Sequence, residues 1–294
     1  MSEQNSAVKI PRRRGRIADT WHRFKKNKGG MIGLIIIVIF ALIALTIDLW
    51  VDYDTQVIAQ NISERLQGPS LQHLFGTDES GRDIFVRILY GSRFSLTIGA
   101  VAVMISVVIG VPIGAVAGYF GGRVENILMR ITDIFGAVPP ILLGIVIVAA
   151  FGASTITLMV AVGVSSIPQF IRITRASVLT VRNQDFIESA RAIGLSEREI
   201  IFSHILPNCL SPIIVQVTLR IASAIISASS LSFLGMGIPA PAPEWGNMLS
   251  SSRNFLRGRS YMTFFPGLAI MVVVLAFNMI GDSLRDALDP KLKK

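Results

Sequence analysis

Long apolar runs alternate with short polar segments along this chain. A helix that crosses a bilayer needs about 20 mostly apolar residues. Six stretches meet that requirement: 30–50, 94–119, 127–151, 154–172, 210–236 and 264–284. The third and fourth are separated only by Gly152, Ala153 and Ser154, which predicts a tight helical hairpin. The pattern therefore predicts an all-α integral membrane protein with six transmembrane helices and little independent soluble structure.

The composition agrees with this interpretation. The 294 residues are 51% hydrophobic and 16% charged, and the mean hydropathy is +0.59, whereas soluble domains carry about 25% charged residues. Cys209 is the single cysteine and the three histidines are scattered, so the sequence offers neither a disulfide framework nor a spacing of metal ligands. We expect no cofactor and no metal.

The positions of the basic residues predict the orientation. Nine of them precede the first apolar run, where a basic block is more often an orientation signal than a nucleic-acid patch. No small-x-small cleavage site follows that run, which favours a retained anchor over a signal peptide. With the amino terminus inside, internal segments hold twenty basic residues and external loops hold seven. The expected order is a basic cytoplasmic tail (1–28), a first transmembrane helix (29–50), an external loop (51–93), a core (94–286) and a second cytoplasmic tail (287–294).

Small residues recur every four positions along the second predicted span. They are Ala102, Ser106, Gly110, Gly114 and Gly118. Because lipid provides no hydrophobic drive between helices, small residues that let two backbones approach are typical of helix interfaces in membranes. We expect this face to pack against another helix. Pro112 in the same span and the pair Pro139–Pro140 in the third span also predict kinks.

The internal segment 172–209 is the main functional signal, because loops beyond about 15 residues usually carry function or structure of their own. Asp185 followed by Glu188 resembles a capping box that starts a short helix, with Phe186, Ile187 and Ala190 on one apolar face. Gly194 fits a helix C-cap. Ser196 and Glu199 form a second capping box, which opens a helix that reaches Leu206–Pro207. The residues therefore predict a helix, a glycine turn and a second helix.

Such a helical pair either lies in the headgroup layer or presents a knob to a partner's groove. Its sequence resembles the EAA loop of bacterial ABC importer permeases: Glu188, Ser189 and Ala190, then Gly194, then Leu206–Pro207. The family pattern is Glu-Ala-Ala, three residues, Gly, nine residues and Ile-x-Leu-Pro. Ser189 replaces the first alanine and His204 stands at the isoleucine position, while the remaining positions fit.

Further segments resemble permeases of the dipeptide, oligopeptide and nickel importers, most closely the second permease subunit of dipeptide and glutathione importers. They are Phe75–Asp78, Gly81–Asp83, Arg87, Gly91, Arg93–Leu96, Ser232–Gly235, Pro243–Gly246, Phe277–Asn278 and Asp289–Pro290, within about residues 70–292. The resemblance implies the type I ABC importer permease fold, a five-helix core plus an N-terminal helix, in the bacterial cytoplasmic membrane. It also implies a sister permease subunit, two ATPase subunits at the loop 172–209 and an extracytoplasmic substrate-binding protein.

Polar side chains in and near the fifth predicted span are candidates for the translocation path. Arg220, Ser223 and Ser227 lie within it, and we expect some of these to line the path because a peptide needs hydrogen bonds. Hydrogen bonding between helices is the alternative for the serines. Structural pairing near the headgroups is the alternative for Arg220. Glu244 and Trp245, in the last external loop, are candidates for part of a gate.

The chain lacks a convincing nucleotide site. The segment from Gly76 to Asp83 has the spacing of a P-loop, but Arg82 and Asp83 stand where the lysine and the hydroxyl are needed. We therefore expect a transport subunit and no enzyme, with ATP hydrolysed by partners. The expected function is ATP-driven import of di- or oligopeptides, including glutathione-like peptides. Import of nickel or a metal chelate, handling of antimicrobial peptides and an ion-coupled carrier or channel remain alternatives.

Overall fold

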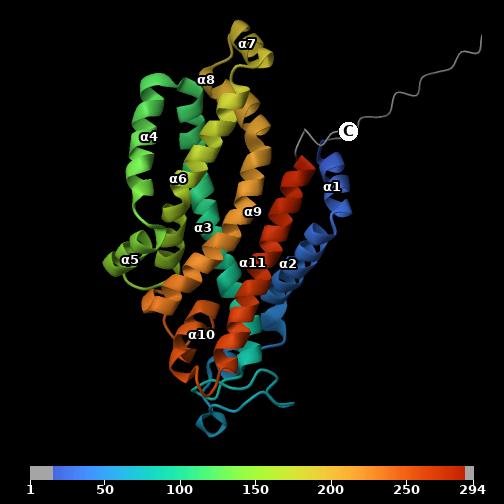
Figure 1. Ribbon diagram of the computed structural model, residues 1–294, viewed down its shortest axis with the longest axis vertical. Coiled ribbons are helices and arrows are strands. Elements are labelled where there is room, and N and C mark those ends of the chain that lie inside the picture. Colours follow the sequence, from blue (N-terminus) through green and yellow to red (C-terminus); the bar gives the residue numbers. More distant parts are fainter. Residues whose placement is uncertain (1–15, 289–294) are drawn as a thin grey trace, which may run out of the picture.

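The computed structural model describes residues 16–288, which form a bundle of helices with a single isolated bridge between Thr77 and Asp83. The long helices run roughly side by side, with α7 projecting at one end and the loop after α2 at the other (Figure 1). The helices are α1 (Arg16–Lys26), α2 (Lys28–Thr46), α3 (Ile84–Phe120), α4 (Gly122–Ala137), α5 (Pro140–Phe151), α6 (Thr155–Val181), α7 (Asp185–Ala192), α8 (Glu197–Glu199), α9 (Leu206–Leu231), α10 (Trp245–Ser252) and α11 (Tyr261–Leu288). Short 3-10 or π segments are η1 (Ile47–Leu49), η2 (Tyr53–Ile58), η3 (Ile62–Glu64), η4 (Ile200–Ile205), η5 (Ser232–Met236) and η6 (Arg253–Phe255).

Within the described residues, five helical segments are long and apolar enough to cross a membrane, and the α4–α5 pair makes a sixth if it counts as one span. The expected all-α membrane fold is confirmed, and two helices extend beyond the predicted apolar spans. α3 begins at Ile84 rather than 94, and α6 continues to Val181 rather than 172. The loops 51–93 and 172–209 are correspondingly shorter than expected. Hydropathy marks the apolar part of a helix, whereas the helix itself continues wherever its polar residues find partners.

The third predicted span is broken. α4 ends at Ala137, α5 begins at Pro140, and the two helices are bent by 83° at this break. Proline lacks the N–H that would continue the helix and disfavours helical geometry in the residue before it. Pro139 accordingly adopts an extended conformation with ψ 131°. The predicted kink at Pro139–Pro140 is a full interruption, whereas α3 continues as one helix through Pro112.

The row of small residues on α3 faces α6. A Cβ atom on Gly110 would lie 2.7 Å from Cβ of Phe170, and one on Gly114 would lie 2.5 Å from the carbonyl oxygen of Ile171. A Cβ on Gly118 would lie 2.8 Å from Cβ of Val178. The two backbones approach so closely that these positions have no room for a side chain.

One side chain completes this interface. The hydroxyl of Ser106 donates to the carbonyl of Gly163 on α6 at 2.7 Å, and also to the carbonyl of Ala102 in its own helix at 3.0 Å. Ala102 and Ser106 are both buried. Together with the glycines they hold α3 and α6 together along most of their shared length.

α11 lies between α2 and α9. A Cβ on Gly33 of α2 would lie 2.6 Å from the carbonyl oxygen of Ala276, and one on Gly281 would lie 2.5 Å from Leu219 of α9. The N-terminal helix pair α1–α2 is thereby attached to the core through α11, which lies beside α2 in Figure 1.

A buried arginine ties loop segments together at the opposite end of the bundle from α7. Arg87 is 3% exposed; it donates to the carbonyls of Val57 at 2.7 Å and Pro241 at 3.1 Å. Its Nε lies 3.6 Å from Asp78, which also binds Arg82 at 2.7 Å. The segment that resembles a P-loop in spacing is therefore folded around this ion pair.

Candidate functional site: the α7 elbow and the polar face of α9

α7 protrudes beyond the ends of the long helices (Figure 1). It begins at Asp185, but its N-cap is Gln184, which makes no side-chain hydrogen bond to the helix. The predicted capping box of Asp185 and Glu188 is therefore wrong: both acids lie inside the first turn, where they favour the positive end of the helix dipole instead. The predicted helix itself is present.

Gly194 ends α7 in the left-handed region, with φ +82°. The N–H of Gly194 donates to the carbonyl of Arg191 at 3.0 Å, and the N–H of Leu195 donates to that of Ala190 at 3.2 Å. This pair of bonds is the Schellman motif, which needs a residue that tolerates positive φ. The predicted glycine C-cap is present, and it turns the chain sharply between α7 and α8.

The second capping box is also present. Ser196 accepts from the N–H of Glu199, whose side chain accepts from the N–H of Ser196 at 3.0 Å. From here the chain is helical through α8, η4 and α9 and into η5, where Gly235 adopts φ +82°; the segment runs from Glu197 to Met236. We call α7, the turn at Gly194 and α8 the elbow. Its second helix, α8, begins the helical segment that crosses the membrane as α9.

The inner side of the elbow is packed against the ends of α3 and α6. Ile187, Ile200 and Ile205 are fully buried in a cluster with residues of both helices, including Val178 and Tyr119. A group that is fully buried and closely packed cannot shift alone. We infer that a force applied to α7 acts on α3, α6 and α9 together.

Polar contacts add to this attachment. The Arg191 guanidinium lies 5.2 Å from the centre of the Tyr119 ring, and its Nε donates to the tyrosine oxygen at 3.4 Å. Arg182, at the C-terminal end of α6, donates to the carbonyl of Gly118 at 2.8 Å. Tyr119 and Gly118 both belong to the last turn of α3, so α6 and α7 are each tied to that turn.

The outer surface of α7 is mixed. Glu188, Ser189 and Gly194 are exposed. Phe186 is 39% exposed and does not share the buried face with Ile187 and Ala190, contrary to the prediction, while Ile193 beside the turn is 78% exposed. Ile193 could not be singled out from the sequence, because one apolar residue before a glycine carries no periodicity. The projecting α7 thus carries an exposed glutamate and, with the turn that follows it, two exposed apolar side chains.

α9 carries a polar face. Gln216, Arg220, Ser223, Ser227 and Ser230 are spaced by four, three, four and three residues, which places them on one side of the helix. Arg220 is partly buried and Ser223 is exposed. Ser223 donates to the carbonyl of Leu219 in its own helix at 3.3 Å. Arg220 and Ser227 make no hydrogen bond or ion pair with another helix that the described part of the chain shows.

The polar face of α9 is open because the neighbouring helices pack elsewhere. Leu219 contacts α11, Ile225 contacts Gly99 of α3, and Leu231 contacts Gly144 of α5. These three contacts occupy the sides and back of α9, which lies in front of α3 in Figure 1. The structure thus brings Arg220, Ser223 and Ser227 together on one partly exposed side of α9, next to the buried Gln216.

Glu244 and Trp245 lie elsewhere and are fully buried. Glu244 caps α10 by accepting from the N–H groups of Gly246 at 2.9 Å and Asn247 at 2.8 Å, and burial raises the pKa of its carboxyl group. The indole of Trp245 donates to the carbonyl of Ile88 at 3.0 Å. In this conformation Trp245 joins α10 to α3 while Glu244 caps α10, and neither lies with the polar face of α9.

Several membrane-spanning helices around a projecting helical elbow define a multi-pass membrane transport permease. The chain belongs to the family of binding-protein-dependent transport system inner membrane components, whose description matches residues 110–294. Residues 15–69 match the N-terminal transmembrane domain of oligopeptide transport permease C. The expected family membership, inferred from the elbow sequence, is confirmed.

Relatives of similar length support the same assignment. The chain is 49% identical to the dipeptide transport system permease protein DppC of Alkalihalophilus pseudofirmus, over 94% of this chain and 90% of that one. It is 44% identical to the glutathione transport system permease protein GsiD of Pectobacterium atrosepticum, over 93% and 90%. Among solved structures, an inward-facing MetNI methionine ABC transporter aligns with a TM-score of 0.58 at 17% identity, over 70% of this chain and 96% of that one. That likeness shows the fold.

Proposed function

We propose that this chain is a permease subunit of an ATP-driven importer of di- or oligopeptides, including glutathione-like peptides. The observation that carries the proposal is the elbow, in which an exposed α7 is continuous with a transmembrane helix through a two-cap turn. The names of the relatives favour peptides over nickel, a metal chelate or an ion-coupled carrier. The chain itself supplies the path, and partner subunits hydrolyse the ATP.

In this proposal α7 docks on one of two ATPase subunits. Phe186 and Ile193 enter an apolar cleft, and Glu188 fixes the register by pairing with a basic group. Phe186 and Ile193 are seven positions apart, the spacing of two apolar anchors of a helix that lies in a partner's groove. Closure of the ATPases then moves α7 as a rigid body, and the packed ends of α3 and α6 move with it.

The remaining partners follow from the same assembly. A sister permease subunit covers the open face of α9, so that Arg220, Ser223 and Ser227 line the path between the two permeases. An extracytoplasmic binding protein delivers the substrate at the end where Arg87 holds the external segments. The basic residues near the termini favour an orientation with both termini on the cytoplasmic side of the bacterial membrane.

The proposal is tested by separating transport from ATP hydrolysis. Gly194→Pro removes the positive φ that the turn needs, and Glu188→Lys reverses the exposed charge on α7. In the reconstituted complex both variants are expected to insert and assemble, while peptide uptake falls by at least ten-fold relative to ATP hydrolysis. The matched control is Arg198→Gln, which alters an exposed charge on α8.

Two results would contradict the proposal. Unchanged uptake in both variants would remove the coupling role of the elbow. Uptake by the unmodified complex that persists without ATP, but stops when a proton uncoupler is added, would assign the chain to ion-coupled carriers instead.

A further inference from the structure

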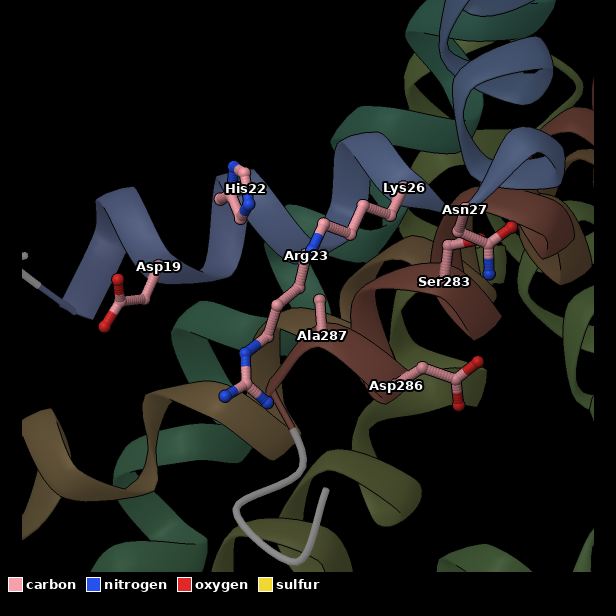
Figure 2. A pocket seen from close by; sticks show the side chains of 8 residues that line it. All are labelled: Asp19, His22, Arg23, Lys26, Asn27, Ser283, Asp286 and Ala287. Carbon is pink, nitrogen blue, oxygen red and sulfur yellow. The ribbon is translucent and has the colours of Figure 1, made fainter. Parts of the chain in front are cut away.

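An open cavity of about 680 Å³ lies between α1 and the C-terminal end of α11. Figure 2 shows the Arg23 side chain reaching from α1 toward the end of α11, with Asp19 on one side of it and Asp286 on the other. Lys26 and Asn27 complete the α1 side of the cavity. Two carboxylates and two cationic groups from different helices therefore face one space.

The position of the cavity relative to the bilayer follows from where α2 begins. Only Asn27 separates α1 from α2, and its side chain accepts from the N–H of Gly30 at 3.2 Å, so that it caps α2. Since α2 is the first membrane-spanning helix, the cavity lies where the chain enters the bilayer. This is the layer of the lipid headgroups.

α1 has the side chains of a helix in that layer. Phe24 is 4% exposed, whereas Trp21, stacked on it at 5.8 Å, remains 45% exposed. The Lys25 ammonium lies 5.1 Å from the Trp21 ring. Tryptophan is enriched at membrane interfaces, where its ring is apolar and its N–H reaches water. α1 therefore carries side chains suited to the membrane interface, and it closes the cavity on one side.

The cavity is lined by two carboxylates and two cationic side chains. A ligand that complements this lining carries both a negative and a positive group. A phosphate accepts hydrogen bonds from Lys26 and Arg23, and a primary ammonium donates to Asp19 and Asp286. A choline headgroup has no N–H to donate, and a glycerol headgroup leaves both carboxylates facing a negative phosphate. Lys26 and Asp286 form no ion pair with each other in residues 16–288.

We propose that the cavity between α1 and α11 binds the headgroup of a phospholipid that carries both a phosphate and a primary ammonium. The bound headgroup bridges the N-terminal helix to the last helix of the core through its two charges. It thereby holds α1 beside the end of α11. This site does not depend on which substrate the permease carries.

Native mass spectrometry of the delipidated full-length chain in its complex tests the proposal. The probes are phosphatidylethanolamine, phosphatidylcholine and phosphatidylglycerol, added separately. We expect the ethanolamine lipid to bind most tightly. Lys26→Gln and Asp286→Asn are expected to weaken its binding by roughly ten-fold each, the loss of about one charge-assisted hydrogen bond.

Two neighbouring residues provide matched controls. Lys25→Gln removes the same charge from the next position of α1, and Asp282→Asn removes the same charge one turn earlier on α11; neither residue lines the cavity. Both are expected to bind the ethanolamine lipid as the unmodified chain does. Equal binding of the ethanolamine and choline lipids, tighter binding of the glycerol lipid, or equal loss in the control variants would overturn the proposal.

Discussion

The Arg191 guanidinium lies 5.2 Å from the centre of the Tyr119 ring. One residue belongs to the projecting α7 and the other to the last turn of α3, so this contact joins the proposed docking element directly to a membrane-spanning helix. Tyr119 is 5% exposed whereas Arg191 is exposed, so the contact has one buried partner and one partner that faces water. A cation over an aromatic ring is worth about 0.5–2 kcal/mol, depending on its exposure.

We predict that Arg191→Gln lowers the peptide uptake per ATP hydrolysed several-fold without unfolding the elbow. The substitution removes the charge above the Tyr119 ring but leaves the packed isoleucines of the elbow intact. The comparison is with Arg198→Gln, which removes an exposed charge from the same elbow. Equal coupling ratios for these two variants in reconstituted vesicles would show that the Arg191–Tyr119 contact transmits no force.

The glycine row on α3 predicts a strict limit on side-chain size. Gly114→Ala places a Cβ 2.5 Å from the carbonyl oxygen of Ile171, so α3 and α6 must separate. Overpacking of this kind costs about 1–3 kcal/mol. We expect a lower melting temperature of the purified complex. Gly258→Ala is the control, since a Cβ there meets nothing within 4 Å. Equal melting temperatures for the two variants would show that the interface is more adaptable than its distances indicate.

The open face of α9 predicts a separation of transport from assembly. Ser223→Leu and Ser227→Leu should lower peptide uptake at least several-fold while the sister subunit still co-purifies, because neither hydroxyl binds another helix in the described residues. Thr218→Leu is the matched control: Thr218 also bonds only within α9, to Ile214 at 2.8 Å, but it points away from this face. If loss of uptake follows loss of co-purification in the serine variants, the serines hold helices together instead.

Glu244 is predicted to stabilise the chain through its capping bonds. Glu244→Gln keeps one acceptor oxygen but turns an amide toward the second N–H, at a cost of about 1–3 kcal/mol. The pKa of the buried carboxyl is raised, so the folded chain holds this proton more tightly than the unfolded chain does. The contribution of Glu244 to the free energy of unfolding therefore falls as pH rises from the ordinary glutamate pKa through the raised value. Thermal unfolding over that range should show a steeper fall for the unmodified chain than for the glutamine variant.

Features that depend on neighbouring residues were predictable from the sequence. The glycine turn at Gly194 and the capping box at Ser196 and Glu199 were both expected, because each motif closes its hydrogen bonds within a few residues. The apolar runs likewise predicted most spans, since every residue in lipid must satisfy its own backbone within the helix. The EAA-like spacing then linked a local shape to a family.

Other features depended on packing between distant segments. The sequence could not show that Phe186 is exposed while Ile187 is buried, because burial on α7 depends on which of its sides contacts α3 and α6. It could not show the full 83° break at Pro139–Pro140, the extension of α6 to Val181, or the burial of Glu244 and Trp245. The sequence also gives no sign of the cavity between α1 and α11.

The sequence by itself determined that this chain spans a membrane and carries a capped helical elbow, because hydropathy and capping act over short stretches of chain. Only the tertiary structure decided which side chains of that elbow remain exposed, which face of α9 stays open, and where oppositely charged groups from the two ends of the chain meet. These outcomes depend on contacts between helices far apart in sequence, and no local pattern records such contacts.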